Sequence, residues 1–126
     1  MNNREIELYH EFKYAVAQCI SNTDSYHITR IESNYTAQGI PDTNFCYKGF
    51  EVWIEFKEGD FELSPLQISW KTRHDTAGGI VAVIRKKGGR YIVEVRDIPK
   101  MSFKSMEGIV RLIIEGIHRA KVQKSV

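Results

Sequence analysis

The sequence predicts an α+β fold in which a mixed β-sheet is flanked by helices, with an extra helix at the C-terminus. The chain has 126 residues, 42% hydrophobic and 27% charged, which suits one globular domain with one core over residues 1–126. Apolar residues recur at helical spacing near both ends and alternate at strand spacing in the middle. The predicted order is α-β-β-β-α-β-β-α, which is typical of a sheet with helices packed on its faces.

The N-terminal part of the chain predicts a helix followed by a strand. Over residues 4–20 apolar side chains recur at steps of three and four residues: Ile6, Tyr9, Phe12, Val16 and Ile20. The polar run at 21–24 then ends the helix. Residues 27–33 place Ile28 and Ile31 among polar neighbours, which predicts the first strand.

A β-hairpin is predicted next, with arms at residues 42–47 and 50–57 and a two-residue turn at Lys48-Gly49. The second arm alternates between an apolar face and a more polar face. The apolar face carries Phe50, Val52, Ile54 and Phe56, and the other face carries Glu51, Trp53, Glu55 and Lys57. This arm is the clearest strand in the sequence.

The C-terminal half predicts a helix, two strands and a final helix. Ser64-Pro65 supplies an N-cap and a first helical residue, and this helix runs to about His74. Two apolar runs separated by a Gly88-Gly89 turn predict the strands: residues 80–84 and 91–95. The last helix, from about 105 to 121, has an apolar stripe made of Met106, Ile109, Val110, Ile113, Ile114 and Ile117.

Charge is unevenly distributed along the chain, although the formal net charge is only +2. Residues 1–84 carry 7 Lys or Arg and 12 Asp or Glu. Residues 85–126 carry 11 Lys or Arg and only 4 Asp or Glu. This asymmetry fits a protein that holds cations with one half and touches a polyanion with the other. The alternative is that the basic residues only solvate the last helix and a hairpin tip, and charge alone leaves both open.

The sequence predicts a cytoplasmic protein without membrane contact. No apolar run approaches the roughly 18 residues needed to cross a bilayer, and the polar N-terminal segment is unlike a secretory signal. The two cysteines, Cys19 and Cys46, have no Cys or His at metal-ligand spacing nearby. We expect both to be reduced and buried.

The predicted hairpin places two carboxylates opposite each other. Asp42 lies six residues before Lys48. Glu55 lies six residues after Gly49, so a two-residue turn makes the carboxylates cross-strand partners with Cβ atoms about 4.5–5.5 Å apart. A divalent cation would remove their repulsion, and Mg²⁺ often needs only one or two carboxylates. Lys57 projects from the same face as Glu55 and can hold a water or stabilise charge on a phosphate.

A plain surface strand is the alternative interpretation of this segment. Glu51, Glu55 and Lys57 would then form the solvated face of an amphipathic strand. That interpretation does not account for Trp53 on the same face, or for Asp42 opposite Glu55. Alternation by itself leaves a surface strand and a metal site both open.

Three segments, in order, resemble the signature of PD-(D/E)xK nucleases. They are Gly39-Ile40-Pro41-Asp42, Trp53-Ile54-Glu55-Phe56-Lys57 and Leu63-Ser64-Pro65-Leu66-Gln67. The pattern is most similar to the VRR-NUC branch and to the Holliday-junction-resolvase-like proteins of phages. The resemblance covers about residues 30–70. It implies a restriction-endonuclease-like αβββαβ core, which matches the predicted order of elements.

The resemblance implies a role for each residue of the central motif. Asp42 and Glu55 would bind Mg²⁺ or Mn²⁺, with the backbone carbonyl of Phe56 as a third ligand. Lys57 would orient or activate the attacking water. The expected products carry a 5′-phosphate and a 3′-hydroxyl.

The family pattern implies two further site residues. Many members add a glutamate from the first helix, and among Glu5, Glu7 and Glu11 the first choice is Glu11, with Glu7 second. The family also places a glutamine, here Gln67, near the metal. Ser64-x-x-Gln67 is in addition a capping box, and one rotamer is not expected to serve both roles.

The resemblance implies an endonuclease that cuts branched DNA, such as Holliday junctions or flaps, in DNA recombination. Paired cuts need two active sites, so a homodimer is expected, and a phage enzyme would act in the host cytoplasm. The Ile-rich last helix either forms that interface or docks on its own sheet. The alternatives are a nicking or restriction-like nuclease with another substrate or a targeting partner, and a non-catalytic DNA-binding module.

The expected DNA contacts are Arg30, Ser33, Asn34, Lys71 and Arg73 around the site, and Arg85, Lys86, Lys87 and Arg90 on the distal hairpin.

Overall fold

A computed structural model describes residues 2–31 and 39–124 of the chain as three helices and six strands. In chain order the elements are α1 (Asn3–Cys19), β1 (Tyr26–Arg30), β2 (Thr43–Tyr47), β3 (Phe50–Glu58), α2 (Pro65–Thr76), β4 (Val81–Lys87), β5 (Arg90–Val95), β6 (Ile98–Phe103) and α3 (Met106–Lys124). None of the described helices is both long enough and apolar enough to cross a membrane.

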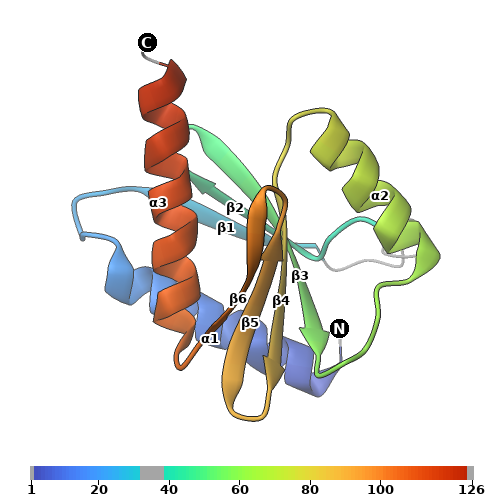
Figure 1. Cartoon of the computed structure of the whole chain (residues 1–126). Coiled ribbons are helices and arrows are strands. Elements are labelled where there is room, and N and C mark those ends of the chain that lie inside the picture. The colour runs from blue at the N-terminus through green and yellow to red at the C-terminus, as the bar shows by residue number, and fades with distance from the viewer. Residues whose placement is uncertain (1, 32–38, 125–126) are drawn as a thin grey trace.

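The six strands form one mixed sheet in the order β1-β2-β3-β4-β5-β6. Neighbouring strands are antiparallel except β3 and β4, which are parallel and are connected through α2. Helices α1 and α3 pack on each other against one face of the sheet, whereas α2 lies on the other side (Figure 1). The predicted α+β class, with a mixed sheet flanked by helices, is therefore confirmed.

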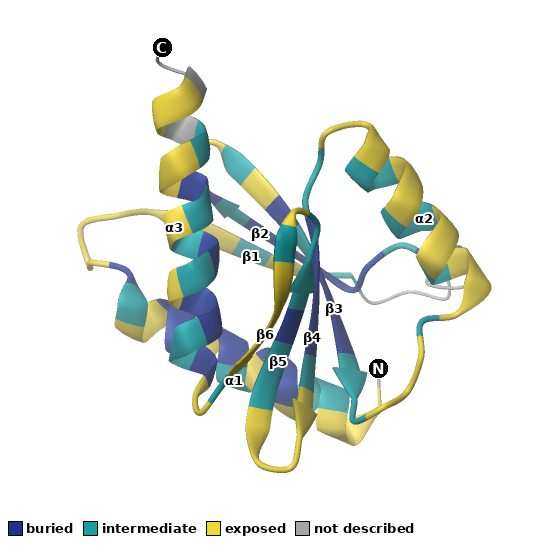
Figure 2. Ribbon diagram, viewed as in Figure 1, coloured by how far each residue is buried: buried dark blue, intermediate teal, exposed yellow. Residues whose placement is uncertain are grey.

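The hydrophobic core lies between the sheet and the layer formed by α1 and α3. Phe12 of α1, Phe56 of β3 and Ile109 of α3 are fully buried there. The rings of Phe12 and Phe56 meet edge to face with their centroids 5.9 Å apart. Helix α2, by contrast, contributes no buried residue along its length (Figure 2). One face of the sheet is thus closed by the core, and the other carries the polar residues of β2 and β3.

The hairpin between β2 and β3 forms as the sequence predicts. Lys48 and Gly49 both adopt positive φ angles, 53° and 83°, which a two-residue hairpin turn of the primed type requires. Along β3, Val52, Ile54 and Phe56 point into the core. The alternate residues of β3 therefore point to the side of the sheet on which α2 lies.

The prediction of five strands is wrong, because Ile98–Phe103 forms a sixth. Pro99 argues against a strand in this segment, since proline cannot donate a hydrogen bond to a ladder. Strand β6 is at the edge of the sheet, where one side of the strand has no neighbour and proline is tolerated. The tight turn before it uses Asp97 at φ 64°, a conformation that Asp adopts more readily than most residues.

Candidate active site

Strands β2 and β3 bring Asp42 and Glu55 together at the open end of their hairpin. The last ladder pair of the hairpin is Thr43 and Ile54. Asp42 directly precedes β2 and Glu55 directly follows Ile54, so both continue from this pair, and a hydrogen bond from the backbone of Asp42 lowers the pKa of Glu55. The backbone carbonyl of Asp42 accepts a hydrogen bond from the N–H of Ile31 at 2.7 Å. Asp42 and Glu55 are only 5% and 7% exposed, so the fold buries two facing carboxylates.

Burial makes both carboxylates hard to ionise. It raises the pKa of Asp42 to about 7 and the pKa of Glu55 to about 8. The negative charge of Asp42 is the second cause of the raised pKa of Glu55. Thr43 Oγ1 donates to Asp42 Oδ1 at 3.2 Å and opposes the rise in the pKa of Asp42. A cation, either a proton or a metal ion, would stabilise this pair.

Charged side chains from the surrounding elements act on the pair, among them Lys57 and Glu5. Lys57 lies two residues after Glu55 on the same face of β3 and is half-buried. Its positive charge lowers the pKa of Glu55. Glu5, in the first turn of α1, raises the pKa of both Asp42 and Glu55. Three carboxylates thus act on one another here, and the positive charge of Lys57 acts on Glu55.

Glu5, and not the predicted Glu11, is the α1 glutamate whose charge reaches the pair. Glu11 instead lies 3.4 Å from Lys86 Nζ on β4. Glu7, the second choice, is exposed and lines a cavity beside the β4–β5 hairpin. Glu5 and Glu11 are about 9 Å apart along the helix axis, so the direction in which α1 crosses the sheet decides which of them approaches the site. The capping box of Asn2 and Glu5, which marks the start of α1, is the only local signal for Glu5.

Gln67 completes the capping box of α2 and at the same time contacts Glu55. Its Oε1 accepts from the backbone N–H of Ser64 at 2.8 Å, and its own N–H donates to Ser64 Oγ at 3.2 Å, which completes the capping box. Its Nε2 donates to Glu55 Oε1 at 2.8 Å. The expectation that one rotamer cannot serve both roles is wrong, because the two ends of the amide face different partners. The amide therefore ties the start of α2 to Glu55.

An aromatic cluster and a glycine position α2 on the sheet. Trp53 of β3 meets Trp70 edge to face with ring centroids 5.5 Å apart, and Trp70 stacks on His74 at 4.7 Å. This cluster accounts for a tryptophan on the polar face of β3. Gly39 has a φ of +82°, and a Cβ added there would lie 2.2 Å from a backbone carbonyl oxygen at the start of α2. Both contacts hold Gln67 within reach of Glu55.

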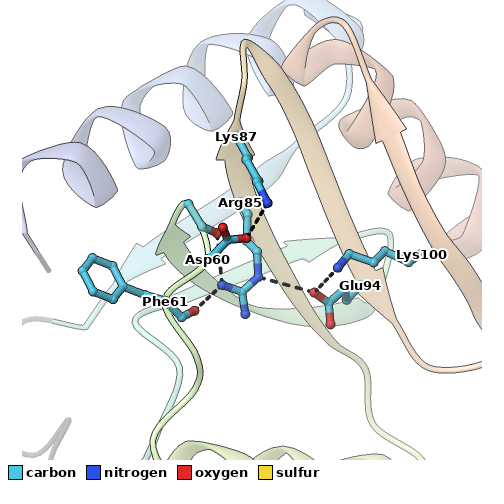
Figure 3. A network of polar contacts seen from close by, with 7 residues as sticks. Asp60, Phe61, Arg85, Lys87, Glu94 and Lys100 are labelled. Carbon is cyan, nitrogen blue, oxygen red and sulfur yellow. Dashed lines mark hydrogen bonds and ion pairs between the residues drawn. The ribbon is translucent and has the colours of Figure 1, made fainter.

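The loop that leaves β3 after Lys57 is held by Arg85 of β4. Arg85 is the Cα partner of Lys57 in the parallel pair of strands. Its guanidinium donates to the backbone carbonyls of Gly59 and Phe61 and pairs with Glu94 of β5 at 3.4 Å (Figure 3). The loop next to the site therefore follows a path that two neighbouring strands determine.

The predicted DNA contacts around the site have different surroundings. The positive charge of Arg30 lowers the pKa of Asp42, and its guanidinium lies over the ring of Tyr9 of α1, 5.5 Å from the ring centroid. Lys71 pairs with Asp75 of the same helix at 2.7 Å, and Arg73 is exposed on α2. The remaining two predicted contacts, Ser33 and Asn34, lie outside the described residues.

The predicted contacts on the distal hairpin have partners within the chain. The polar contacts are Lys86 with Glu11 at 3.4 Å, Lys87 with Asp60 at 2.8 Å and Arg90 with Ser102 at 2.7 Å. The side chains of Lys86 and Lys87 nevertheless remain 44% and 55% exposed. Exposed ion pairs contribute about 0–1 kcal/mol, so a phosphate group can replace these carboxylates as the partner.

The donor atoms at the carboxylate pair fit a small set of Mg²⁺ ligands. Within residues 2–31 and 39–124, no group of three or more His, Cys, Asp and Glu side chains is arranged to hold a metal ion. Asp42 and Glu55 supply two carboxylates, and Phe56, whose side chain is buried in the core, can add only its backbone carbonyl. Mg²⁺ keeps several waters and is commonly bound through one or two carboxylates. Two buried carboxylates that resist joint ionisation match this chemistry.

No family model matches the sequence, and the curated proteins contain no match to it. The functional interpretation of the site therefore depends on its geometry and on the resemblance of its motifs.

Proposed function

We propose that this protein is an endodeoxyribonuclease with a restriction-endonuclease-like core, that it depends on Mg²⁺ or Mn²⁺, and that it cleaves branched DNA. The observation that carries the proposal is the buried pair of Asp42 and Glu55 with Lys57 on the same face of β3. The order of elements from α1 to β4, which is α-β-β-β-α-β, agrees with the core that the motifs imply. Residues whose pKa is shifted by burial and by a specific charged neighbour cluster at functional sites.

The carboxylate pair has the role of holding the metal ion. Asp42 and Glu55 would bind it together with the backbone carbonyl of Phe56. When bound, the ion supplies Lewis-acid polarisation of the phosphate and a more acidic water. Gln67 Nε2 keeps the Glu55 carboxylate in one orientation through its hydrogen bond. Glu5 adds negative charge, which strengthens the attraction of the site for a divalent cation.

Lys57 acts on the reacting phosphate. In the proposed reaction a water oxygen forms a bond to phosphorus and loses a proton to solvent. The bond from phosphorus to the 3′ oxygen breaks, and that oxygen gains a proton, so the products carry a 5′-phosphate and a 3′-hydroxyl. Negative charge on the phosphate oxygens grows as the water attacks. The ammonium group of Lys57 stabilises this charge or orients the water through a hydrogen bond.

Branched DNA is proposed as the substrate because the motifs resemble those of Holliday-junction-resolvase-like proteins. Arg30, Lys71 and Arg73 would contact phosphates without reading the base sequence. Symmetric cutting of a junction needs two sites, so the active form is proposed to be a homodimer. The apolar stripe of α3 is buried within its own chain, at Ile109 and Ile117 among others, so the second copy would bind elsewhere.

The test is cleavage of labelled four-way junction, flap, nicked and linear duplex DNA, each with Mg²⁺, Mn²⁺ or EDTA. We expect paired cuts in the branched substrates that require the metal. Lys57→Ala should lower the rate by about 100-fold or more, because it removes a preorganised positive charge from the reacting phosphate. The matched control is Lys104→Ala, an exposed lysine outside the site. Thermal unfolding checks that both variants fold.

Other outcomes separate the parts of the proposal. Equal cutting of all four substrates would keep the nuclease and remove branched DNA as its substrate. DNA binding that weakens with salt but is never followed by cleavage would favour a non-catalytic binding module. Cleavage that persists in EDTA, or that Lys57→Ala does not slow, would contradict the proposed chemistry.

A further inference from the structure

Basic side chains continue from Lys57 across the sheet toward its β6 edge. Lys57 of β3 is the Cα partner of Arg85 of β4, which in turn is the Cα partner of Ile92 of β5. Directly paired residues point to the same face of a sheet. Lys87, two residues after Arg85, points to this face as well. Val93, which follows Ile92, is buried in the core on the other face. The row therefore lies on the sheet face away from the core.

A cavity of about 190 Å³ lies over this row, beside the loop that follows β3. Among the described residues, its charged lining consists of Asp60, Arg85, Lys87, Glu94 and Lys100 (Figure 3). Three cations and two carboxylates give this lining a formal charge of +1. Each phosphodiester group of DNA carries one negative charge. A single phosphate group would therefore neutralise the lining of the cavity.

Two of the three cations in the cavity are accessible to a ligand. The side chains of Lys87 and Lys100 are 55% and 63% exposed. Arg85 is only 13% exposed, and its guanidinium donates to backbone carbonyls of the loop after β3. Arg85 therefore shapes the cavity, and the contacts with a ligand fall to the two lysines, one from β4 and one from β6.

The present partners of both lysines can be replaced. Lys87 pairs with Asp60 at 2.8 Å, but the Asp60 side chain is 78% exposed and can turn into solvent. Lys100 pairs with Glu94 at 3.6 Å, and Glu94 also pairs with Arg85 at 3.4 Å. Glu94 therefore keeps a partner when Lys100 binds another group. Exposed ion pairs of this kind are weak, so a phosphate can compete with them.

The cavity is close to the proposed site of reaction. Ile92, which lines the cavity, is two strand steps from Lys57. Neighbouring strands are about 4.8 Å apart, so this separation is about 10 Å. The phosphates of one strand of duplex DNA follow one another at about 3.4 Å along the helix axis. A DNA strand that crosses the sheet from Lys57 toward β6 therefore brings a phosphate to the cavity within a few nucleotides.

We propose that Lys87 and Lys100 together bind one phosphate of the DNA strand that leaves the Asp42–Glu55 site. In the free protein Asp60 pairs with Lys87, and it gives way to this phosphate when DNA binds. The inference rests on the proposed nuclease function. It adds Lys100, on the edge strand, to the phosphate contacts that the sequence predicts.

The first test measures affinity for a labelled four-way junction over a range of salt concentrations in Mg²⁺. Lys57→Ala is the parent protein, because it is expected to cleave slowly. Adding Lys87→Ala and Lys100→Ala together should weaken binding about 10-fold, and the slope of log affinity against log salt should fall by about one, because one phosphate is no longer neutralised. Lys104→Ala, at an exposed lysine outside the cavity, is the matched control and should change neither quantity. Thermal unfolding checks that all variants fold.

Asp60→Asn tests whether Asp60 competes with the phosphate. It should tighten binding about 2- to 5-fold, because the ion pair with Lys87 no longer has to open. Asp97→Asn removes the same charge from an exposed side chain outside the cavity and should tighten binding less. If the two variants change affinity equally, Asp60 acts only through its overall charge, and the proposed competition is overturned.

Neutral methylphosphonates locate the contact on the DNA. One phosphate at a time is replaced on each side of the cleavage position. We expect one position at which the replacement weakens binding by the parent protein about 10-fold but leaves binding by the double lysine variant unchanged. Lysines with a purely structural role would not produce this dependence on a single phosphate.

The outcomes distinguish this inference from the proposed function. If wild-type protein cleaves DNA and no methylphosphonate position depends on the two lysines, the phosphate site is wrong and the nuclease stands. If the double lysine variant lowers the salt slope by about two, the lysines bind separate phosphates, and the shared site is overturned. If wild-type protein neither cleaves nor binds DNA, the proposed function fails and the inference fails with it.

Discussion

At the scale of single residues, Asp42 and Glu55 are subject to two effects that oppose ionisation. Burial removes each carboxylate from water, and nearby negative charge opposes ionisation further: that of Asp42 and Glu5 at Glu55, and that of Glu5 at Asp42. A sheet face this close to a core would be more stable with apolar residues at both positions. The pair therefore belongs to the class of sites at which stability is lost for function.

The raised pKa values predict how stability depends on pH without metal. Folding raises the pKa of Asp42 from 3.8 to about 7 and that of Glu55 from 4.5 to about 8, so the protonated forms stabilise the fold. This contribution is complete below the unfolded values and is lost as pH rises through the folded values. Asp42→Asn should therefore be more stable than wild type at pH 9 in EDTA, by roughly 1–3 kcal/mol.

Thermal unfolding between pH 4 and pH 9, in EDTA and in Mg²⁺, measures this difference. Mg²⁺ should raise the Tm of wild type at the alkaline end, because it binds the ionised carboxylates, and should leave Asp42→Asn nearly unchanged. Asp97→Asn, at a side chain that is 82% exposed, is the control. If the Tm of wild type and the Tm of Asp42→Asn depend on pH in the same way, the proposed repulsion between the two carboxylates is contradicted.

At the scale of elements, the start of α2 is part of the site. The capping box that begins this helix also positions the amide of Gln67 against Glu55. The aromatic cluster of Trp53, Trp70 and His74 keeps the helix at that place on the sheet. Gln67 therefore both marks the start of α2 in the sequence and contacts Glu55 in the site.

Two substitutions separate the structural role of the capping box from the contact with Glu55. Ser64→Ala removes the cap, which should lower the free energy of unfolding by about 1 kcal/mol, but it leaves Nε2 of Gln67 able to reach Glu55. Gln67→Ala removes both contacts and should also lower the cleavage rate about 10-fold or more, because Glu55 loses its hydrogen-bond donor. Urea unfolding and cleavage rates measure the two effects. Equal cleavage by the two variants would show that the contact with Glu55 has no role in the reaction.

At the scale of the whole molecule, the two faces of the sheet differ in stability. The core joins α1 and α3 to one face, whereas α2 rests on the other without a buried residue of its own. Segments with few buried apolar contacts open at lower free energy than the rest of a protein. Amide hydrogens of α2 should therefore exchange with solvent faster than those of α1 and α3.

Gly39→Ala tests how α2 is held. The added Cβ would meet the backbone of α2, so we expect α2 to open more often and the free energy of unfolding to fall by about 2 kcal/mol or more. Gly49→Ala is the matched control, because its φ is also positive, +83°, but no atom lies within 4 Å of the added Cβ. Hydrogen exchange followed by mass spectrometry reports both variants. If both speed exchange in α2 equally, the close approach of Gly39 has no part in holding the helix.

The sequence by itself determined the features that arise from local geometry. Alternation along β3 decided which side chains point away from the core, because successive residues of a strand face opposite sides. The two-residue turn at Lys48-Gly49 set the register of the hairpin as far as Thr43 opposite Ile54, and so brought Asp42 next to Glu55. The N-cap at Ser64 located the start of α2. These features depend on residues less than twenty positions apart.

Only the tertiary structure decided the features that depend on how distant elements pack. The direction of α1 across the sheet selected Glu5 over Glu11, and the position of α2 allowed one amide of Gln67 to serve two partners. The edge position of β6 allowed a strand that contains Pro99. Helical periodicity shows which face of an element is buried, but the angle and depth of packing are set by all the elements together.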